Sequence, residues 1–346
     1  MMSCGEETQE TGDCRMSRDD LLPGPDARRR ALLGACAGIA LLPRPSRAAQ
    51  AGWPDRPLRL VVPFAPGGTV DLSARLLAPR LAERLGQPVI VENRPGVSGN
   101  LAIESVARAQ PDGHTLLYAP TALVINPHLV RGSLDPLRAL APISMVSRNW
   151  LTLLARKELP VSDAAGLVAL ARARPGAISC GTAGGMPQLG CLLFESLASV
   201  DLNEVPYKGM GLATLDLAAG SIDLLFGVGS ISQSFVQAGR ARALAITAGS
   251  RRAGWADGLP TLSETLPGYV LEGWEGLLAP AGTDAAIVER LGREVAATLA
   301  EPAVRARLAE LSLEPVGSTP AQFAQAMARD MKRVGEIAAR AGLEPQ

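Results

Sequence analysis

The sequence predicts an α/β protein made of two lobes. Short apolar runs that suit β-strands alternate with helical patterns, which is typical of a parallel sheet covered by helices. Gly-rich loops connect a strand to a helix in both halves of the chain. The chain has 346 residues, which is enough for two domains with separate cores.

Apolar residues make up 47% of the chain and charged residues 20%, in keeping with a globular protein. The 34 basic and 34 acidic side chains cancel, so the chain lacks the basic excess of nucleic-acid-binding surfaces. We therefore expect no nucleic-acid partner. An anionic molecule would have to be held by local geometry rather than by net positive charge.

Residues 1–49 are expected to be a signal peptide. Arg28–Arg30 precede an apolar stretch, 31–42, and the small residues Ser46 and Ala48 lie before a cleavage point. The apolar stretch is too short for a transmembrane helix, which needs roughly 20 residues. The pattern predicts export to the periplasm. It leaves both the twin-arginine (Tat) and the general (Sec) route open.

Met16 is an alternative initiator, because the segment before it is polar and unlike the start of a signal peptide. Cys36 follows a lipoprotein-like Leu-Gly-Ala sequence, but the apolar core continues past it, which favours a plain signal peptide. Beyond the signal the chain keeps Cys180 and Cys191. These two cysteines either pair or serve as small buried hydrophobes, and the sequence leaves both readings open.

The first lobe is expected to comprise residues 53–154 and 274–346. Gly86 should end its first helix. Its expected strands are 58–62, 88–92, 114–119 and 276–280, and its expected helices are 72–85, 101–109, 284–300, 302–311 and 320–341.

The second lobe is expected to comprise residues 155–273, so that the chain crosses between the lobes twice. A ligand cleft would lie between the lobes, at the carboxyl ends of the strands, where open α/β sheets bind ligands. The expected strands are 177–180, 203–207, 222–226 and 242–247, and the expected helices are 163–173, 188–198 and 211–219.

The loop Pro63–Asp71, between a strand and a helix, is the sharpest candidate for a binding site. Gly67 and Gly68 let the backbone approach a ligand closely. The amides from Gly68 into Thr69 open a helix, and helix N-termini attract anions. Two roles stay open for Asp71, which either compensates the helix dipole or orients a polar or cationic part of the ligand.

A second strand–helix loop, Asn93–Asn100, offers amides and hydroxyls to another ligand oxygen. Ser98, Gly99 and Asn100 are the candidate contacts in it. The alternative is a plain helix cap on a Gly turn.

A third loop, 181–185, holds the corresponding place in the second lobe, with Thr182 and Gly184 as candidate contacts. One Gly-rich loop is weak evidence for binding. Three such loops spread over two lobes favour a ligand site.

Catalytic motifs are missing from the sequence, so we expect no enzyme. No P-loop, no Gly-x-Ser-x-Gly and no Gly-x-Gly-x-x-Gly occurs. His114 is expected on the surface of a strand, and His128 has no Cys or acidic partner at metal-ligand spacing. Lys208 is expected to be solvated or structural. We expect no cofactor and no metal, and a monomer, since nothing indicates stable oligomers.

A series of short motifs runs along the chain after the signal. They are Trp53–Pro57, Pro63–Asp71, Glu92–Gly96, Pro111–Leu117, Ile125–Pro127, Val205–Gly209 and Leu278–Thr283. In this order they resemble the Bug family (TctC-like), the substrate-binding proteins of tripartite tricarboxylate transporters. The resemblance covers essentially all of the chain beyond the signal.

The resemblance implies a type II periplasmic-binding-protein fold whose two lobes close on a small carboxylate: a di- or tricarboxylate, an acidic amino acid or an aromatic acid. The loop Phe64–Asp71 would contribute amides and its acidic residue, and the segments Ser98–Asn100 and Ala119–Thr121 would face the ligand. Neither ATP nor a metal would be needed, and membrane transporter subunits would drive uptake. An alternative is a ligand sensor that signals through a sensor receptor without transport.

The predicted ligand-binding residues are Phe64, Gly67, Gly68, Thr69, Asp71, Ser98, Gly99, Asn100, Thr121, Thr182 and Gly184. Two departures from the family pattern concern the second lobe. The loop Gly181–Leu189 is read as about two residues shorter, with Gln188 near a usual His. Gly227 follows Phe226 where Asp is common. Both departures bear on which ligand is bound.

Overall fold

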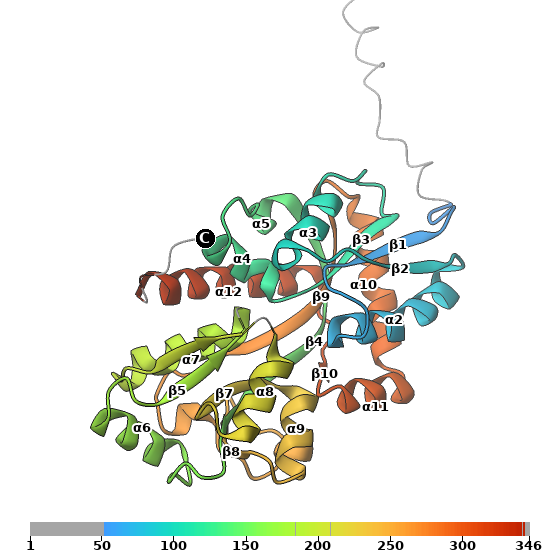
Figure 1. Cartoon of the computed structure of the whole chain (residues 1–346). Helices are drawn as coiled ribbons and strands as arrows, with labels where there is room; N and C mark the ends of the chain where they lie inside the picture. The colour runs from blue at the N-terminus through green and yellow to red at the C-terminus, as the bar shows by residue number, and fades with distance from the viewer. Residues whose placement is uncertain (1–51, 184, 208, 341, 343–346) are drawn as a thin grey trace, which may run out of the picture. The chain divides into compact units, whose positions relative to one another are not determined.

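The computed structural model describes residues 52–183, 185–207, 209–340 and 342 (Figure 1). The predicted signal peptide lies outside these residues, as do Gly184 and Lys208. The described chain alternates strands and helices in the predicted manner. Two sheets, called sheet A and sheet B below, are joined through one long strand, β4 (Leu140–Ala155).

Sheet A begins with three parallel strands in the spatial order β2-β1-β3, and β9 and β4 extend it in antiparallel orientation. The interior of β1 is almost wholly buried, which suits its near-continuous apolar sequence. The short strand β10 pairs with β4. The bounds are β1 Leu58–Val62, β2 Val89–Asn93, β3 Thr115–Pro120, β9 Glu272–Pro280 and β10 Glu314–Pro315.

Helices cover both faces of sheet A. α2, α10 and α11 bury one apolar cluster, and α3, α4 and the first half of α12 bury another. Gly86 ends α2 in the left-handed conformation with a φ of 74°, which confirms the predicted end of that helix. The bounds are α2 Thr69–Leu85, η3 Val97–Gly99, α3 Asn100–Ala107, α4 Ala122–Leu129, α5 Pro136–Ala139, α10 Ala285–Leu299, α11 Pro302–Glu310 and α12 Pro320–Arg340.

Sheet B has the parallel strands β7, β5 and β6. β4 pairs antiparallel with β7 at one side, and β8 pairs antiparallel with the other edge of β4. α6 and α7 pack on one face and α8 and α9 on the other. The bounds are β5 Ser179–Thr182, β6 Asn203–Pro206, β7 Leu224–Val228, β8 Arg242–Ile246, α6 Ala164–Ala173, α7 Gly185–Ala198, α8 Met210–Ala219 and α9 Gly229–Gln237. The short turns η4 and η5 span Gly254–Ala256 and Leu262–Glu264.

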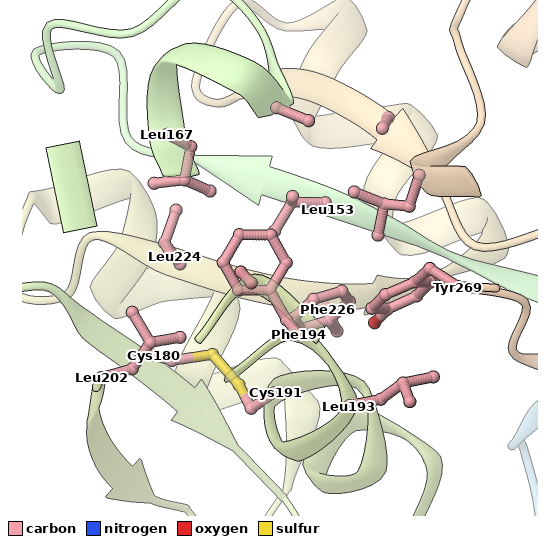
Figure 2. Packing of buried hydrophobic residues seen from close by; sticks show 14 of the residues in the cluster. Leu153, Leu167, Cys180, Cys191, Leu193, Phe194, Leu202, Leu224, Phe226 and Tyr269 are labelled. Carbon is pink, nitrogen blue, oxygen red and sulfur yellow. A yellow bond between two sulfur atoms is a disulfide. The ribbon is translucent and has the colours of Figure 1, made fainter. Parts of the chain in front are cut away.

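The main apolar cluster of sheet B contains the aromatic rings of Phe194, Phe226 and Tyr269 (Figure 2). Phe226 stacks on Tyr269 with ring centroids 6.3 Å apart and lies tilted against Phe194. The Tyr269 hydroxyl, which is fully buried, donates a 2.8 Å hydrogen bond to the Gly190 carbonyl. This bond satisfies the one polar atom that the ring brings into the core.

β4 carries the chain from sheet A into sheet B. Its residues 140–150 pair with β9, and its residues 151–155 pair with β7 and β8. At the crossing, the buried hydroxyl of Thr247 accepts from the Leu151 N–H at 2.8 Å and donates to the Leu271 carbonyl at 2.6 Å. The predicted lobe boundaries near these crossings stay a prediction, because the chain from Gly52 onward groups into one compact unit.

α12 contributes to the cores of both sheets. Phe323 and Met327 belong to a sheet A cluster, whereas Val334 and Ile337 belong to the main cluster of sheet B. A single helix therefore packs against elements on both sides of the crossing strands.

The elements between residues 120 and 158 were not predicted. The structure has α4, α5 and β4 there. Asn126-Pro127 is a turn signal in isolation, but Pro127 lies inside α4, where burial of the neighbouring Val124 and Ile125 outweighs the local preference. α9 was missed as well, because Gly229 at its start reads as a helix breaker.

The expected surface position of His114 is wrong. The residue is only 7% exposed, and its ring lies edge-on to Trp53 with centroids 6.0 Å apart. Its Nε2 lies 3.1 Å from a carboxylate oxygen of Asp55. The Pro-Asp-Gly turn before it folds the ring inward, which the local sequence does not reveal. Among the described residues, no helix is both long and apolar enough to cross a membrane.

Candidate functional site

Three helix N-termini gather at one edge of sheet A. β1, β2 and β3 are parallel, so their carboxyl ends share an edge, and α2, α3 and α4 follow them (Figure 1). None of these three helices has a side-chain cap, whereas α5, α6 and α10 are capped by aspartates. Uncapped N-termini leave N–H donors and the positive ends of helix dipoles at this edge, which suits an anion.

The loop before α2 exposes Gly67 and Gly68. Gly67 has a φ of 91°, a conformation that disfavours any side chain, and Gly68 is extended. Phe64 and Thr69, at the two ends of this stretch, are half-buried. The exposed glycine backbone leads directly into the first turn of α2, as the sequence predicts.

Asp71 points into the protein and is only 2% exposed. Its carboxylate accepts hydrogen bonds from the Gly67 N–H at 2.9 Å, from Arg75 Nε at 2.9 and 3.1 Å, and from Asn93 Nδ2 at 2.9 Å. Burial raises the pKa of the Asp71 carboxyl, but hydrogen bonds from Arg75, Gly67 and Asn93 outweigh it and hold the pKa below its ordinary value. The ionised carboxylate therefore fastens the Gly67 turn to the helix and to the end of β2.

The first two loops are fastened to each other. Asn93, the last residue of β2, also donates from Nδ2 to the Phe64 carbonyl at 3.0 Å. Gly99 has a φ of 94°, and a Cβ at this position would lie 2.9 Å from the Cβ of Pro63. Close approach of the two backbones therefore requires glycine at position 99. The two loops form one surface rather than two independent contacts.

A buried amide network supports the loop before α3. Ser98 has a φ of 54°, which is unusual for a residue with a side chain. Asn126 Nδ2 donates to the Ser98 carbonyl at 3.0 Å and to Asn100 Oδ1 at 2.7 Å, and Asn100 Nδ2 donates to Ser133 Oγ at 2.7 Å. The side chain of Asn100 is thus engaged within the protein, which leaves the loop backbone and the exposed side chain of Ser98 as the parts that can meet a ligand.

Replacing Asn126 with alanine should lower the free energy of unfolding by about 1–2 kcal/mol, because a buried carbonyl and a buried amide oxygen lose their donor. The amide hydrogen of Gly99, bonded to the Gly96 carbonyl at 2.9 Å, should also exchange faster. Chemical denaturation and hydrogen exchange by NMR measure the two effects. Asn203→Ala, at an exposed position on β6, is the control. Unchanged exchange at Gly99 would show that Asn126 does not support the loop.

Thr121 continues the pairing of β3 with β9. Its hydroxyl donates to the Trp274 carbonyl at 3.2 Å and accepts from the Trp274 N–H at 2.6 Å, so its one proton is already used. Thr121 lines a small cavity of about 30 Å³ together with Met186 and Leu189 of α7. The start of α4 on sheet A and the start of α7 on sheet B therefore border the same space.

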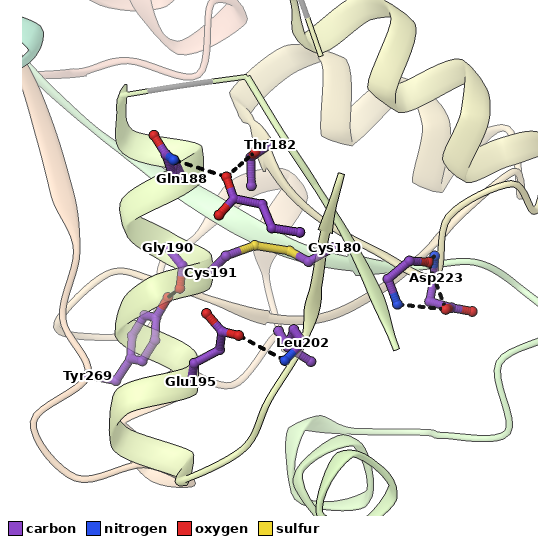
Figure 3. The surroundings of a disulfide bond; sticks show 11 residues. Cys180, Thr182, Gln188, Gly190, Cys191, Glu195, Leu202, Asp223 and Tyr269 are labelled. Atoms are coloured by element: carbon purple, nitrogen blue, oxygen red, sulfur yellow. Dashed lines mark hydrogen bonds between the residues drawn. A yellow bond between two sulfur atoms is a disulfide. The ribbon is translucent and has the colours of Figure 1, made fainter. Parts of the chain in front are cut away.

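The corresponding loop of sheet B is organised around Glu204. Thr182 Oγ1 donates to Glu204 Oε1 at 2.7 Å, and Gln188 Nε2 donates to the same oxygen at 3.0 Å (Figure 3). Thr182 is buried and ends β5, and α7 begins at Gly185, three residues earlier than the predicted 188. Gly184 lies outside the described residues. The polar side chains of this loop thus bind another side chain.

Cys180 and Cys191 form a disulfide, which decides the question that the sequence left open. Both residues are buried in the main core of sheet B (Figures 2 and 3). The disulfide ties the middle of β5 to the second turn of α7, with the Gly-rich loop between them. The ends of this loop are therefore held by a covalent bond.

The remaining helices at this edge of sheet B, α8 and α9, also lack side-chain caps. Gly227 is buried at the end of β7, and a Cβ there would clash with Ser232 Oγ and the side chain of Leu154. The aspartate common at this place in the family pattern would not fit without rearrangement. Ser232 and Leu154 thus occupy the space that a larger side chain at position 227 would need.

A buried carboxyl group lies under the first loop and was not predicted. Glu275 on β9 is 1% exposed and accepts from Ser73 Oγ at 2.5 Å and from Tyr118 Oη at 2.9 Å. Burial raises the pKa of Glu275, and the two hydrogen bonds offset this only in part. An acidic residue inside an otherwise apolar strand was the available signal. Its partners come from α2 and β3, which only the fold brings together.

The structure divides the predicted residues into two groups. Those from Phe64 to Thr121 lie at the edge of sheet A, and Thr182 lies at the end of β5 in sheet B. Arg75, Asn93, Asn126 and Glu204 organise these loops and were not predicted as site residues. A polar residue at the end of a strand was a usable signal for Asn93, whereas Glu204 lies inside β6. No group of three metal-ligating side chains occurs among the described residues.

Comparison with known proteins places the chain among solute receptors. A family model described as "Tripartite tricarboxylate transporter family receptor" (TctC) matches residues 73–343. The R. palustris protein Rpa4515, solved with adipate, is 34% identical, with 85% of this chain and 100% of that chain covered and a TM-score of 0.75. The periplasmic binding protein BugD is 30% identical, with 85% and 100% covered and a TM-score of 0.72.

MatC (Rpa3494) from Rhodopseudomonas palustris, solved with bound malate, is 32% identical, with 83% of this chain and 100% of that chain covered and a TM-score of 0.70. These structures confirm the predicted α/β fold, which is that of periplasmic binding proteins.

Proposed function

The chain belongs to the tripartite tricarboxylate transporter receptor family (TctC), and from this premise we propose that it binds a small dicarboxylate at the edge of sheet A and delivers it to a membrane transporter. The family consists of periplasmic solute receptors of transporters, not of enzymes. The relatives solved with ligands hold adipate and malate, which are both dicarboxylates.

The observation that carries this proposal is the set of uncapped helix N-termini at α2, α3 and α4. One carboxylate of the ligand binds the amides of Gly68 and Thr69 and those of the loop before α3. No side chain competes for these donors at the helix starts. The role of Asp71 is to hold the Gly67 turn so that the amides converge, because its carboxylate is turned inward and fully engaged.

The second part of the ligand meets the loops of sheet B. α8 and α9 offer uncapped N-termini there, and Thr182 stands at the end of β5. Closure of two lobes about β4 and the segment before β9 brings these loops to the ligand. The chain reaches the periplasm through its signal peptide, and the partner is the membrane part of a tripartite transporter.

A thermal-shift screen of carboxylates tests the proposal. Adipate, malate and other mono-, di- and tricarboxylates are added to the purified protein, with adipamide as the uncharged control. The right ligand at a hundredfold its Kd stabilises the protein by about 2.7 kcal/mol, which raises Tm by about 5–10 °C. Adipamide should give no shift. Failure of every carboxylate to raise Tm would refute carboxylate binding.

A further inference from the structure

A second cavity lies where the chain crosses between the two sheets. It has a volume of about 240 Å³ and is lined by residues of β4, of the start of β9 with Val270 before it, and of α12. None of the predicted ligand-binding residues that the structure describes lines it. The lining residues are Met145, Arg148, Val270, Glu272, Gly273, Trp274, Arg329, Asp330 and Arg333.

Both carboxylates of this cavity already have partners. Glu272 accepts from Arg252 at 2.8 Å and from the Gly249 N–H at 3.1 Å. Asp330 accepts from Trp274 Nε1 at 3.1 Å and from Arg329 Nε at 3.1 Å. Their negative charge is therefore compensated within the protein.

Two guanidinium groups of the cavity have donors to spare. Within the described part of the chain, no salt bridge joins Arg148 or Arg333 to a carboxylate, and Arg333 makes only a long 3.5 Å contact to the Gly268 carbonyl. Each guanidinium carries five N–H donors in a planar fork that matches the oxygens of carboxylate and phosphate. Arg148 comes from β4 and Arg333 from α12, so an anion between them would join two elements.

We propose that this cavity binds a small oxyanion, a carboxylate or a phosphate, between Arg148 and Arg333. The lining of this cavity differs in residues and charge from the proposed dicarboxylate site, although Arg333 also borders the small cavity that Thr121 lines. The loops at the edge of sheet A offer backbone amides, and Arg94 in them is paired with Glu92, whereas this cavity offers guanidinium groups on rigid elements. An anion here would tie α12 to β4 at the point where the chain passes from sheet A to sheet B.

Isothermal titration of the full chain with inorganic phosphate, and separately with acetate, tests the site at constant ionic strength. Calorimetry is preferred to thermal shift, because phosphate also stabilises proteins without binding a site. For phosphate we expect one saturable site in wild type and about tenfold weaker binding, or more, in the Arg148→Ala/Arg333→Ala variant. Acetate can also meet the amides at the edge of sheet A, so for acetate we expect the variant to lose one of the binding components that wild type shows. The anion that binds more tightly identifies the headgroup chemistry.

Lys332→Ala is the matched control, because it removes a positive charge from the same helix at a side chain that is 81% exposed and outside the cavity. Its affinity should equal that of wild type. If the double variant does not fold, Arg148→Gln and Arg333→Gln are tested singly. Equal losses in the Lys332 variant, or no binding tighter than about 10 mM in wild type, would overturn the proposal.

The double variant should keep the thermal shift produced by the dicarboxylate. The two proposals therefore fail separately. If wild type binds the dicarboxylate but neither phosphate nor acetate, only the proposal for the cavity fails. If wild type does not bind the dicarboxylate, the proposal for the edge of sheet A fails. Selenate soaked into crystals would locate the anion by its anomalous signal, and a peak away from both guanidinium groups would refute the assignment.

Discussion

Replacing Asp71 with alanine should weaken dicarboxylate binding at least tenfold and lower the free energy of unfolding by about 2–3 kcal/mol. Both effects have one cause. The buried carboxylate is the shared acceptor for the Gly67 N–H, Arg75 and Asn93, and its removal deprives all three donors of this acceptor. The Gly67 turn then loses its position, and the amides at the start of α2 no longer converge. Isothermal titration and chemical denaturation measure the two quantities.

Arg75→Ala removes the ion pair of Asp71 but leaves its carboxylate in place, so the two contributions can be measured separately. The Arg75 side chain is 48% exposed, so its ion pair with Asp71 contributes little, and the variant should bind nearly as wild type does. Asp71→Asn keeps the size of the side chain and removes its charge, and it should lie between alanine and wild type. Unchanged affinity and selectivity in Asp71→Ala would instead support the helix-dipole role.

The pH dependence offers a check on the charge of Asp71. Its folded pKa is lowered below the ordinary value of 3.8, so the carboxylate stabilises the folded state above that value. This contribution is lost as the pH falls through the folded pKa. The difference in unfolding free energy between wild type and Asp71→Asn should therefore be constant near neutral pH and shrink below pH 3.8. A difference that persists at the lowest pH would mean that the charge is not its source.

Reduction of the Cys180–Cys191 disulfide should lower the free energy of unfolding by about 3 kcal/mol and Tm by about 5–10 °C. The sulfur atoms join residues separated by 11 positions, and opening the link restores entropy to the unfolded chain. The disulfide also holds both ends of the Gly-rich loop of sheet B, so ligand affinity should fall too. Thermal unfolding and titration with and without dithiothreitol measure both effects.

The double variant Cys180→Ala/Cys191→Ala is the control for nonspecific effects of the reductant. It should resemble reduced wild type in Tm, and dithiothreitol should change it no further. Glu195→Gln tests the same region without touching sulfur, because Glu195 lies one turn after Cys191 in α7 and accepts from the Leu202 N–H at 2.8 Å. Equal Tm values for oxidised and reduced wild type would show that the core of sheet B does not depend on the link.

The Gly-rich loop of sheet B is the place where the sequence analysis expects this chain to differ from its relatives. Thr182 and Gln188 are both bound to Glu204, and Gly227 is enclosed by Ser232 and Leu154. The polar side chains at positions 182 and 188 are thus engaged within the protein. We expect ligand choice to depend on these contacts, since the edge of sheet A offers the same amides to any carboxylate.

The sequence by itself determined the α/β class, the order of most strands and helices, the family, and the place of the loop Pro63–Asp71 between a strand and a helix. These follow from local signals: apolar periodicity, Gly67 and Gly68 at a strand–helix junction, and Gly86 where a left-handed end was needed. Such signals involve only a few neighbouring residues, so they can be recognised without knowledge of the fold.

Tertiary structure alone decided what depends on residues far apart in the chain. Asp71 accepts a hydrogen bond from Asn93, and Asn126 supports Ser98 across the space between α4 and α3. The cysteines pair because β5 and α7 bring them together, and Glu275 finds Ser73 and Tyr118 only in the folded sheet. Hydrogen bonds and burial depend on distance in space, and a buried acceptor bonds to the donor that the folded chain brings next to it. The composition and spacing of the sequence do not contain these distances.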